Sequence, residues 1–450
     1  MDINAAIDRA IALHQGGDLG GAEALYRQIL IEAPALAGIH YLLGMAVLGQ
    51  GRAADAVKAL RTAVRLKPGV AEWSLNLGIA LRRTGETTAA LATLRAAAPL
   101  CAGAPVLQAE VLSETGALLL ALGQDAEAEL ALRAALSLAP GHALARDNLA
   151  ALLFNRFAGA GALDRSDAPS ALAEAVQLAP QRTAAWFRLG QALLRAEQPQ
   201  SALEAFDKGL GQNPQDQNLI LGRSDALSVL GRFEEARDAA IKAAALAPAT
   251  LGPPVALAVA SHGLGMLSAA AAALRGVLAV DPAHVPALLN LGNVLNDLGD
   301  DAGAEECYRQ VLSHEPGLPV AHWQRAQARL RAGDLEEGWR EYEWRWRMPG
   351  FVVPSAVRAL PVWDGGAAPE GRLLIHAEQG HGDSLQFIRY VPLLRDRGMD
   401  IHVQVQPALV RLFRESLPDD IGVGALGDPI PAGTVLRCPL LGLPLRLGTR

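Results

Sequence analysis

Proline recurs in this sequence with a period of 34 residues, and that period constrains the fold more than any other feature. The intervals 34–68, 180–214, 214–248, 248–282 and 282–316 each separate two prolines by 34 residues. A period of roughly 20 to 50 residues indicates a chain built from stacked structural repeats. The prolines in this register are Pro34, Pro68, Pro140, Pro180, Pro214, Pro248, Pro282 and Pro316.

Three other residue types share this register. A glycine lies seventeen residues before the proline slot, an alanine follows five residues after the glycine, and a large apolar residue follows four residues later. We expect the glycine to permit a turn with positive φ, and the proline to end the second helix of the unit. The alanine lets two helices cross closely, and the large side chain fills the space one turn further on. The glycines are Gly17, Gly51, Gly85, Gly123, Gly231, Gly265, Gly299 and Gly333, while Glu197 holds this place in one unit. The alanines are Ala22, Ala56, Ala90, Ala128, Ala202, Ala236, Ala270 and Ala304. The large residues are Tyr26, Leu60, Leu94, Leu132, Phe206, Leu274, Tyr308 and Tyr342.

A 34-residue helix–turn–helix unit with this pattern resembles the tetratricopeptide repeat (TPR). The resemblance covers about ten units from residue 3 to about residue 350, and it implies a right-handed α-superhelix. We therefore predict a mainly α fold with a TPR solenoid over residues 1–350. Two places carry extra residues, four around 98–108 and six around 154–168, and we interpret both as surface insertions that bulge at turns.

Charge and cysteine content exclude several classes of protein. The net charge is −7 with both signs mixed along 450 residues, which gives no basic footprint for nucleic acid. The cysteines, Cys101, Cys307 and Cys438, are few and widely spaced, so we predict a cytoplasmic protein with no disulfide framework or zinc site. The apolar stretch 251–280 is long, but it follows the repeat register and contains helix breakers, so we predict no membrane span.

Polar residues recur at one place on the first helix of several units. Stacked TPR units usually bind peptides on a concave face that these first helices line, so we predict a protein or peptide partner. In the O-linked N-acetylglucosamine transferases, which this architecture resembles, a ladder of asparagines at this place grips the backbone of extended acceptor proteins. The alternative is that these side chains only face solvent, since Leu42, Gly222 and Ala256 hold the place in other units. The predicted groove residues are Asn76, Asn148, Asn290, Arg188 and Gln324.

Aromatic residues gather where the repeats end. Five of the seven tryptophans lie between residues 323 and 363. On a continuous helix, Trp339, Tyr342 and Trp346 would share one face, and we interpret that stripe as a seal between the last TPR helix and the following domain. Sugar stacking is the alternative. Residues 351–371 contain three prolines and a Gly-Gly pair, and we predict a linker there.

After the linker, the sequence period changes from that of helices alone to strands alternating with helices. Residues 372–377 and 400–405 read as strands, and residues 383–398 and 407–417 read as helices. Such alternation predicts a parallel α/β sheet. We therefore expect a partial α/β Rossmann-like segment over residues 372–450.

The run HAEQGHGDSLQF, beginning at His376, resembles the start of the glycosyltransferase-like domain found behind TPR arrays in many bacterial proteins. More distantly, GHGD followed by Pro392 resembles the opening of the heptosyltransferases, which have the two-lobed GT-B fold. The resemblance implies that Asp383 is a general base that activates an acceptor hydroxyl, and that a nucleotide sugar is the co-substrate. The alternative for Asp383 is that it only caps the N-terminus of a helix.

The glycine-spaced turn predicts a ligand site after the first strand. We expect Gly380 and Gly382 to allow a tight turn that brings the backbone close to a ligand, with Asp383 opening the helix. No spacing in this stretch predicts a metal site. The predicted lining residues are His376, Glu378, Gln379, Gly380, His381 and Gly382.

Two functions follow from the sequence. The first is a peptide-binding TPR array fused to the first part of a glycosyltransferase-like domain, which recruits an acceptor protein for glycosylation. In the resembled family the donor sits mainly on a second lobe, and residues 372–450 are too few for it. We therefore expect little or no transferase activity from this chain alone. The second function is a non-catalytic TPR scaffold for protein–protein interaction.

Overall fold

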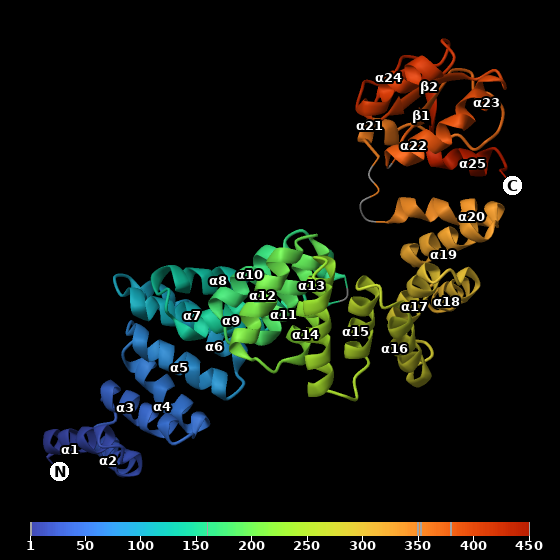
Figure 1. Ribbon diagram of the computed structural model, residues 1–450. Coiled ribbons are helices and arrows are strands. Elements are labelled where there is room, and N and C mark those ends of the chain that lie inside the picture. Colours follow the sequence, from blue (N-terminus) through green and yellow to red (C-terminus); the bar gives the residue numbers. More distant parts are fainter. Residues whose placement is uncertain (1, 160, 349–350, 352, 379, 450) are drawn as a thin grey trace. The chain divides into compact units, whose positions relative to one another are not determined.

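The computed structural model describes residues 2–159, 161–348, 351, 353–378 and 380–449. It divides into two compact units, residues 1–230 and 231–450. Figure 1 shows that each unit is dominated by consecutive antiparallel helices, and that a small sheet follows the last of them. The predicted fold class, a mainly α TPR array followed by a partial α/β segment, is confirmed.

The first unit consists of thirteen α-helices and two short 3-10 turns among its described residues. The helices alternate as first and second members of each repeat, and in the six repeats from α1 to α12 the two helices pack against one another. The elements are α1 (Ile3–Gln15), α2 (Leu19–Glu32), α3 (Ala37–Gly49), α4 (Ala53–Leu66), α5 (Ala71–Arg83), α6 (Thr87–Ala97), η1 (Ala98–Cys101), α7 (Pro105–Ala121), α8 (Asp125–Leu138), α9 (Ala143–Arg156), η2 (Ala162–Asp164), α10 (Ala168–Leu178), α11 (Thr183–Arg195), α12 (Pro199–Gln212) and α13 (Gln217–Val229).

The turn between the helices of each repeat uses the glycine that the register predicts. All eight glycines in that slot have positive φ, from 70° at Gly123 to 87° at Gly333. Glu197 holds the slot in the remaining case and has φ of 58°, which makes it the one non-glycine residue with positive φ among the described residues. The left-handed turn is therefore kept even where the sequence does not supply glycine, at a cost of about 1–2 kcal/mol.

The predicted small and large residues form the inside of the array. All eight alanines of the register are fully buried, and so are seven of the eight large residues. Each large residue packs on a glycine or other small residue of the preceding first helix. A Cβ added at Gly78 would lie 2.6 Å from Leu94 Cδ2, and one at Gly292 would lie 2.4 Å from Tyr308 Cε1. The two helices of a repeat therefore lie so close together that the facing position has no room for a larger side chain.

The two insertions are folded rather than simply bulged. Around residues 98–108, the chain continues from α6 into the turn η1, where Cys101 is fully buried. Around residues 154–168, Phe157 and Leu163 are buried and η2 packs against α11. Both insertions lie at turns between helices, as predicted, and each also carries apolar side chains that the neighbouring helices bury.

The second unit continues the array and ends in the α/β segment. The stretch 251–280 forms two helices separated by a turn at Gly265, as the repeat register predicts. None of the described helices is long and apolar enough to cross a membrane. The helices are α14 (Phe233–Leu246), α15 (Gly252–Gly263), α16 (Leu267–Val280), α17 (Val285–Asp297), α18 (Asp301–His314), α19 (Pro319–Ala332) and α20 (Leu335–Tyr342), followed by η3 (Glu343–Arg347).

A four-stranded parallel sheet forms the core of the α/β segment, with strand order β3-β2-β1-β4. The chain runs from β1 outward through β2 to β3 and then returns to the other side of β1 as β4. The predicted helix 383–398 is divided into three pieces, because Pro392 begins a new helix there. The elements are α21 (Ser355–Arg358), β1 (Arg372–His376), α22 (His381–Phe387), η4 (Ile388–Tyr390), α23 (Val391–Arg395), β2 (Asp400–Val405), α24 (Pro407–Ser416), β3 (Gly422–Ala425), β4 (Thr434–Pro439), η5 (Leu440–Gly442) and α25 (Leu443–Arg446).

One hydrophobic core joins the last repeat to the sheet. It contains Ala326 and Tyr342 from the repeat together with Phe387 and the buried faces of β1 and β2. Trp339 packs edge-on against Phe387, with ring centroids 5.4 Å apart. The predicted seal is confirmed for Trp339 and Tyr342. Trp346 lies in η3 after the helix has ended, so it packs elsewhere, beside Val353 and Val357.

The stretch 351–371 runs along the sheet instead of only linking two domains. Val353, Val357 and Trp363 are buried, and Val362 forms an isolated parallel bridge with Arg437 of β4. The predicted domain bounds, which are 1–350 for the solenoid, 351–371 for the linker and 372–450 for the α/β segment, remain a prediction.

Candidate functional site

The predicted site lies at the carboxyl ends of the parallel strands. His376 is the last residue of β1, and Glu378 follows two residues later. Because β2 and β4 lie on opposite sides of β1, the strand order reverses between β1 and β4. Doubly wound sheets bind ligands in the crevice at such a reversal.

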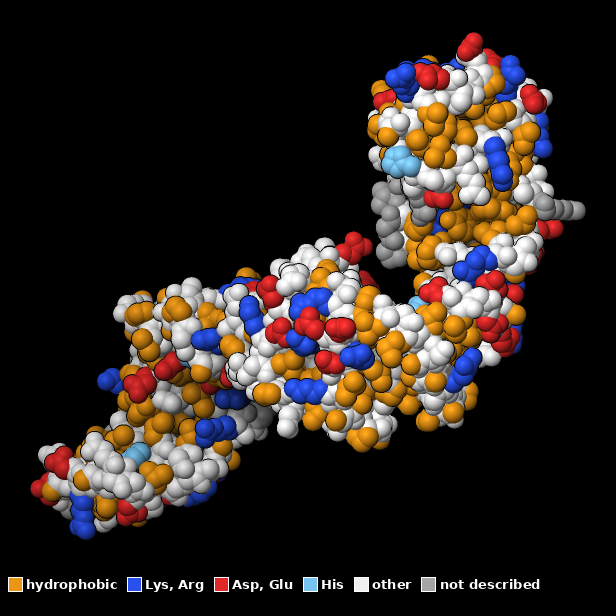
Figure 2. Space-filling model, viewed as in Figure 1, with side chains coloured by type: hydrophobic (Ala, Val, Ile, Leu, Met, Phe, Trp, Pro, Cys, Tyr) orange, Lys and Arg blue, Asp and Glu red, His pale blue; other side chains and the backbone are white. Residues whose placement is uncertain are grey.

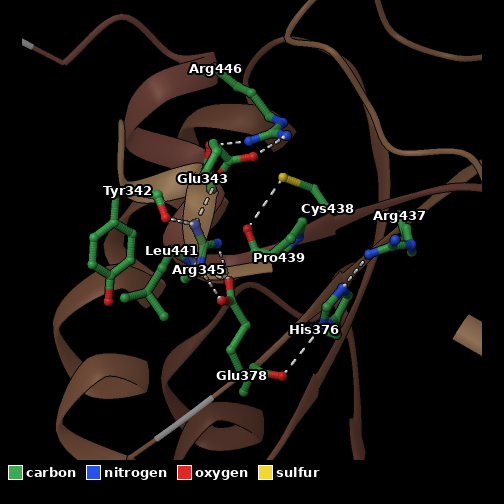
Figure 3. Close-up of polar contacts among 12 residues, drawn as sticks. Tyr342, Glu343, Arg345, His376, Glu378, Arg437, Cys438, Pro439, Leu441 and Arg446 are labelled. Carbon is green, nitrogen blue, oxygen red and sulfur yellow. Dashed lines mark hydrogen bonds and ion pairs between the residues drawn. The ribbon is translucent and has the colours of Figure 1, made fainter. Parts of the chain in front are cut away.

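In this chain the crevice holds Arg345, a residue of η3 whose side chain is fully buried (Figure 3). Arg345 Nε and Nη2 donate to the two carboxylate oxygens of Glu378, at 2.7 and 3.0 Å. Its Nη1 donates to Glu343 at 2.8 Å and to the carbonyl oxygen of Tyr342 at 3.0 Å. The backbone N–H of Leu441, just after β4, also donates to Glu378, at 3.2 Å. The predicted lining residue Glu378 is therefore occupied by an internal partner.

The charges of this network balance one another. Burial alone would lower the pKa of the Arg345 guanidinium, but its carboxylate partners Glu378 and Glu343 outweigh burial and raise it. Burial alone would raise the pKa of Glu343, but Arg345 and Arg446 outweigh burial and lower it. Arg446 of α25 donates to Glu343 at 3.1 Å and to the carbonyl oxygen of Trp363 at 2.6 Å. The network thus links the end of the repeats to the loop after β1, to the segment after β4 and to α25.

His376 is buried, with an exposed fraction of 3%. Burial lowers the pKa of its imidazole to about 4, and the nearby positive charge of Arg437 acts in the same direction. The His376 ring lies 3.3 Å from the carbonyl oxygen of Ala377 through Nδ1, and 3.4 Å from Arg437 Nη1 through Nε2. The imidazole is therefore neutral at neutral pH, and both of its nitrogens already contact other groups of the chain. Such a ring suits a structural or hydrogen-bonding role better than a proton-transfer role.

The glycine-spaced loop after β1 differs from the predicted tight turn. Helix α22 begins at His381, so Asp383 is its third residue and does not open it. The N-cap is Gly380, whose φ is −66°, and Gly382 is helical, so neither position needs the conformational freedom of glycine. The N-cap position belongs to Gly380, and Asp383 makes no side-chain capping bond to the described residues, so the alternative interpretation as an N-cap is wrong too.

The loop is held by Gln406, the residue that follows β2. Ser384 Oγ donates to Gln406 Oε1 at 2.8 Å, and Gln406 Nε2 donates to the carbonyl oxygen of Gly380 at 3.3 Å. His381 and Gly382 are exposed, and Asp383 is half-buried without a side-chain hydrogen bond to any described residue. Gln379 lies outside the described residues. The structure therefore brings His376 and Glu378 together inside the segment and leaves His381, Gly382 and Asp383 at its surface.

A pocket of about 120 Å³ lies beside His376. Gln404 of β2 and Leu426 after β3 line it on the sheet side, and Trp346 and Val357 line it on the other side. Gln404 pairs in register with His376, and its Nε2 donates to the carbonyl oxygen of Asp428 at 3.0 Å. The pocket is partly apolar and has no carboxylate other than Glu378 among its described lining residues, and Arg345 already binds Glu378.

The predicted groove residues lie on the first helices of their repeats, and all five are half-buried. Asn76 Nδ2 donates to Tyr41 Oη at 3.0 Å and to the carbonyl oxygen of Glu72 at 3.1 Å. Asn290 Nδ2 donates to the carbonyl oxygen of Pro286 at 2.8 Å. These two asparagines therefore already use an amide donor within the chain, while their carbonyl oxygens have no partner in the described structure.

The other three groove residues differ from one another. Asn148 Nδ2 and Gln324 Oε1 are shielded from solvent and have no hydrogen-bond partner among the described residues. Arg188 donates only to two backbone carbonyl oxygens of the described chain, at 3.4 Å.

Sequence reasoning missed Glu114, which holds the same place in the fourth repeat, two residues before Gly116. It is buried and accepts a hydrogen bond from Arg82 Nε at 2.8 Å. The small residue of the first helix, here Gly116, was the sequence signal that could have identified Glu114, because the groove place lies two residues before it.

On the face drawn in Figure 2, Lys and Arg side chains are interspersed with Asp and Glu along the helices. This distribution agrees with the mixed charge of the sequence.

Comparison with known proteins identifies the repeats. Residues 41–105, 152–217 and 193–250 match one family profile and residues 262–330 match a second, and both profiles describe the tetratricopeptide repeat. The protein FlbA of Caulobacter vibrioides is 28% identical over 207 residues, which are 36% of this chain and 34% of FlbA. Tetratricopeptide repeat protein 7B of Homo sapiens is 27% identical over 135 residues, which are 30% of this chain and 16% of that protein.

Among solved structures, TTC0263, a thermophilic TPR protein of Thermus thermophilus, is 26% identical and has a TM-score of 0.35. The similarity covers 37% of this chain and 92% of TTC0263. The helix pairs that the two profiles match are tetratricopeptide repeats, so this is a TPR protein. In this TPR protein a parallel α/β segment follows the last repeat. The chain spans about a third of FlbA and about a sixth of the human relative.

Proposed function

We propose that this chain is a cytoplasmic protein-interaction scaffold whose TPR array binds an extended peptide segment of a partner protein. The observation that carries the proposal is that half-buried polar side chains hold one place on the first helices α5, α9 and α11 of the first unit and α17 and α19 of the second, with hydrogen-bonding atoms left unused at Asn148 and Gln324. Buried polar atoms in folded proteins nearly always have partners, so unused ones favour a ligand. The three cysteines are buried and unpaired, which agrees with a reducing compartment.

An extended peptide backbone is the ligand that this row fits best. Each peptide unit offers one donor and one acceptor, and an amide side chain supplies the complement of both. Asn76 and Asn290 keep a carbonyl oxygen available to accept from a peptide N–H, because only their Nδ2 atoms are used within the chain. Such contacts read the backbone without reading the sequence, so binding of varied partners is expected.

We further propose that the bound protein is recruited to a glycosyltransferase-like domain of which residues 372–449 are the first part. The parallel sheet, the loop GHGD at its carboxyl edge and the core shared with the last repeat support this proposal. In it, Asp383 is the general base for the acceptor hydroxyl and a nucleotide sugar is the co-substrate. His381 and Gly382 then face the acceptor, because they lie exposed beside Asp383.

A specific observation favours the second candidate, a scaffold without catalysis. Arg345 fills the crevice between β1 and β4 and neutralises Glu378, which leaves Asp383 as the one predicted acidic residue available to a ligand. Asp383 itself is only half-buried, and its neighbours His381 and Gly382 are exposed.

The peptide proposal is tested by selecting ligands for the full chain from a displayed random peptide library. The affinity of one selected peptide is then measured for the wild type and for Asn290→Ala. We expect at least about a fivefold loss of affinity, because one hydrogen bond contributes roughly 1 kcal/mol. The control is Gln310→Ala, on the second helix α18 of the same repeat. Equal losses in both variants, or a library that yields no ligand, would contradict the proposal.

Nucleotide-sugar binding separates the two candidates. A ligand at a hundred times its dissociation constant adds about 2.7 kcal/mol to the stability of the state that binds it. Thermal unfolding of the chain with UDP-, GDP- and ADP-sugars in turn therefore reports binding. Stabilisation that is lost in Asp383→Asn supports the glycosyltransferase-like role over the scaffold.

A further inference from the structure

A groove of about 590 Å³ lies between the second helices α2 and α4 of the first two repeats. The first helix α3 forms its floor with Leu43 and Val47, which are both buried. The two second helices form its walls, and Leu30 of α2 and Ala59 of α4 continue the apolar lining upward from the floor. The other lining residues are Arg27, Ile31, His40, Asp55, Lys58 and Thr62.

This groove does not open on the face of the array that carries the predicted peptide groove. In α3 the peptide-groove place is held by Leu42. Successive residues of an α-helix are rotated by about 100°, so the floor residues His40, Leu43 and Val47 lie roughly 100–160° around α3 from Leu42. The groove therefore opens on the side that the second helices form, and we call it the second-helix groove.

Ile31 extends the apolar lining of the second-helix groove out to its rim. Its exposed fraction is 82%, the highest of any large apolar side chain among the described residues. A single exposed apolar residue is ordinary on a protein surface, but one that borders an apolar groove enlarges the patch that a partner can cover. No other unit has a large aliphatic residue at this place, which lies five residues after the large-residue slot of the repeat. The residues there are Arg65, Pro99, Ser137, Gln177, Gly211, Ala245, Ala279 and Ser313.

The rim of the second-helix groove carries an excess of positive charge. Arg27 lies on one wall and Lys58 on the other, with side chains that are 54% and 79% exposed. Glu23 pairs with both Arg27 and Arg52, and Asp55 pairs with both Arg52 and Lys58, so three bases share two carboxylates. Exposed pairs of this kind contribute little, so Lys58 can exchange Asp55 for an anion that a ligand brings.

The polar lining residues favour a helical ligand over an extended one. His40 Nε2 already lies 2.9 Å from the carbonyl oxygen of Pro34, and Thr62 Oγ1 donates to the carbonyl oxygen of Lys58 at 3.1 Å. The groove therefore offers few free groups to an extended peptide backbone, whose N–H and C=O groups need partners. A helix satisfies its backbone groups internally and presents only side chains.

We propose that the second-helix groove binds one amphipathic helix of a partner protein, with an apolar stripe flanked by Asp or Glu. The stripe packs on Leu43, Val47 and Ile31, as an amphipathic helix does in an apolar groove. The flanking carboxylates face Arg27 and Lys58 on the two walls. This inference goes beyond the proposed peptide-binding function, because it assigns a second partner to a different face of the array.

The test uses a displayed library of helix-forming peptides in which one stripe and its flanking positions are varied. We expect helices selected on the full chain to carry apolar residues along the stripe and Asp or Glu beside it. Ile31→Ser should weaken binding of such a helix by about tenfold or more, because it removes an apolar side chain that the helix buries. The control is Val280→Ser, at an exposed β-branched residue that also lies at the end of a second helix, α16. Both positions are exposed, so neither variant disturbs the core.

A charge exchange tests the flanking contacts. Lys58→Glu should weaken binding of the acidic helix by about threefold or more, and the same helix with Lys at its flanks should bind Lys58→Glu better than the wild type. The control is Lys242→Glu, at an exposed residue of the second helix α14.

Three results would overturn the inference. The first is a library that yields no helix, or helices that bind Ile31→Ser as well as Val280→Ser. The second is a preference for Lys and Arg beside the stripe. The third is self-association of the chain that Ile31→Ser abolishes in sedimentation velocity, because the groove would then hold a second copy. All three leave the binding of extended peptides on the first helices unaffected.

Discussion

Arg345 and Glu378 form a bidentate ion pair inside the second unit, with both side chains shielded from water. Arg345 comes from the turn that ends the repeats, and Glu378 comes from the loop that follows β1. The pair therefore fixes the sheet relative to the last repeat. It also occupies the crevice where a sheet of this topology binds ligands.

Replacing Arg345 by Met should destabilise the second unit by about 3–5 kcal/mol, because the change leaves Glu378 and Glu343 buried without their partner. Urea unfolding followed by tryptophan fluorescence measures the effect, since five of the seven tryptophans lie between residues 323 and 363. Arg340→Met is the matched control, because Arg340 pairs with Glu336 and Glu337 on the exposed face of α20. A loss of less than about 1 kcal/mol for Arg345→Met, the value for a surface pair, would show that the network is not structural.

Gly190→Ala should destabilise the first unit by about 1–3 kcal/mol through overpacking. The added Cβ would lie 2.3 Å from Phe206 Cε1 and Cζ, and Phe206 is fully buried and cannot move away freely. The control is Gly211→Ala in α12, where a Cβ meets nothing within 4 Å. Helix content measured by circular dichroism during thermal unfolding distinguishes the two. Equal stability of both variants would mean that the repeat helices can separate without cost.

Glu197→Gly should stabilise the first unit by about 1 kcal/mol. The left-handed conformation costs a non-glycine residue about 1–2 kcal/mol, and glycine removes that cost. Part of the gain is lost, because glycine raises the conformational entropy of the unfolded chain. The control is Glu204→Gly, in the interior of α12, which should destabilise by about 1 kcal/mol. Urea unfolding of both variants checks the sign. A destabilised Glu197→Gly variant would show that the Glu197 side chain makes contacts that outweigh its backbone strain.

The second unit should lose stability as the pH falls from about 6.5 toward 4, because of His376. Its folded-state pKa of about 4 lies below the ordinary value of 6.5, so in this window the unfolded chain binds a proton that the folded chain does not. The full loss is about 3.5 kcal/mol, because the two pKa values differ by about 2.5 and each pKa unit corresponds to roughly 1.4 kcal/mol. His376→Asn should flatten the stability profile between pH 6.5 and 5, above the range of most carboxylates. The control is His381→Asn, at an exposed position. If His376→Asn leaves the pH dependence of stability the same as in the wild type, the idea of a buried neutral imidazole at His376 is wrong.

The local features of the repeats could be read from the sequence because each depends on residues close in the chain. The turn glycines have positive φ, and the alanines of the register are buried, as predicted. Strand β2 and helix α24 also begin at the predicted residues, since alternation and Pro407 mark them locally.

The candidate site was harder to predict because its partners are distant in the chain. Arg345 and Glu378 are 33 residues apart and meet only because the turn after α20 folds into the crevice beside β1. Nothing in the local pattern distinguishes Glu378 from a residue that faces solvent. The start of α22 was misplaced by two residues, because GHGD permits a helix to begin at either end of the motif. The fold of the six-residue insertion depends on burying Phe157 and Leu163 under neighbouring elements, which the repeat register does not encode.

The most direct test of the account is to locate a bound peptide on the array. A library-selected peptide carrying a photoreactive group is cross-linked to the full chain, and the attached residues are identified by mass spectrometry. We predict cross-links on first helices such as α9, α11 and α17, near Asn148, Arg188 and Asn290. Cross-links confined to second helices such as α8, α10 and α18 would contradict the concave-face account.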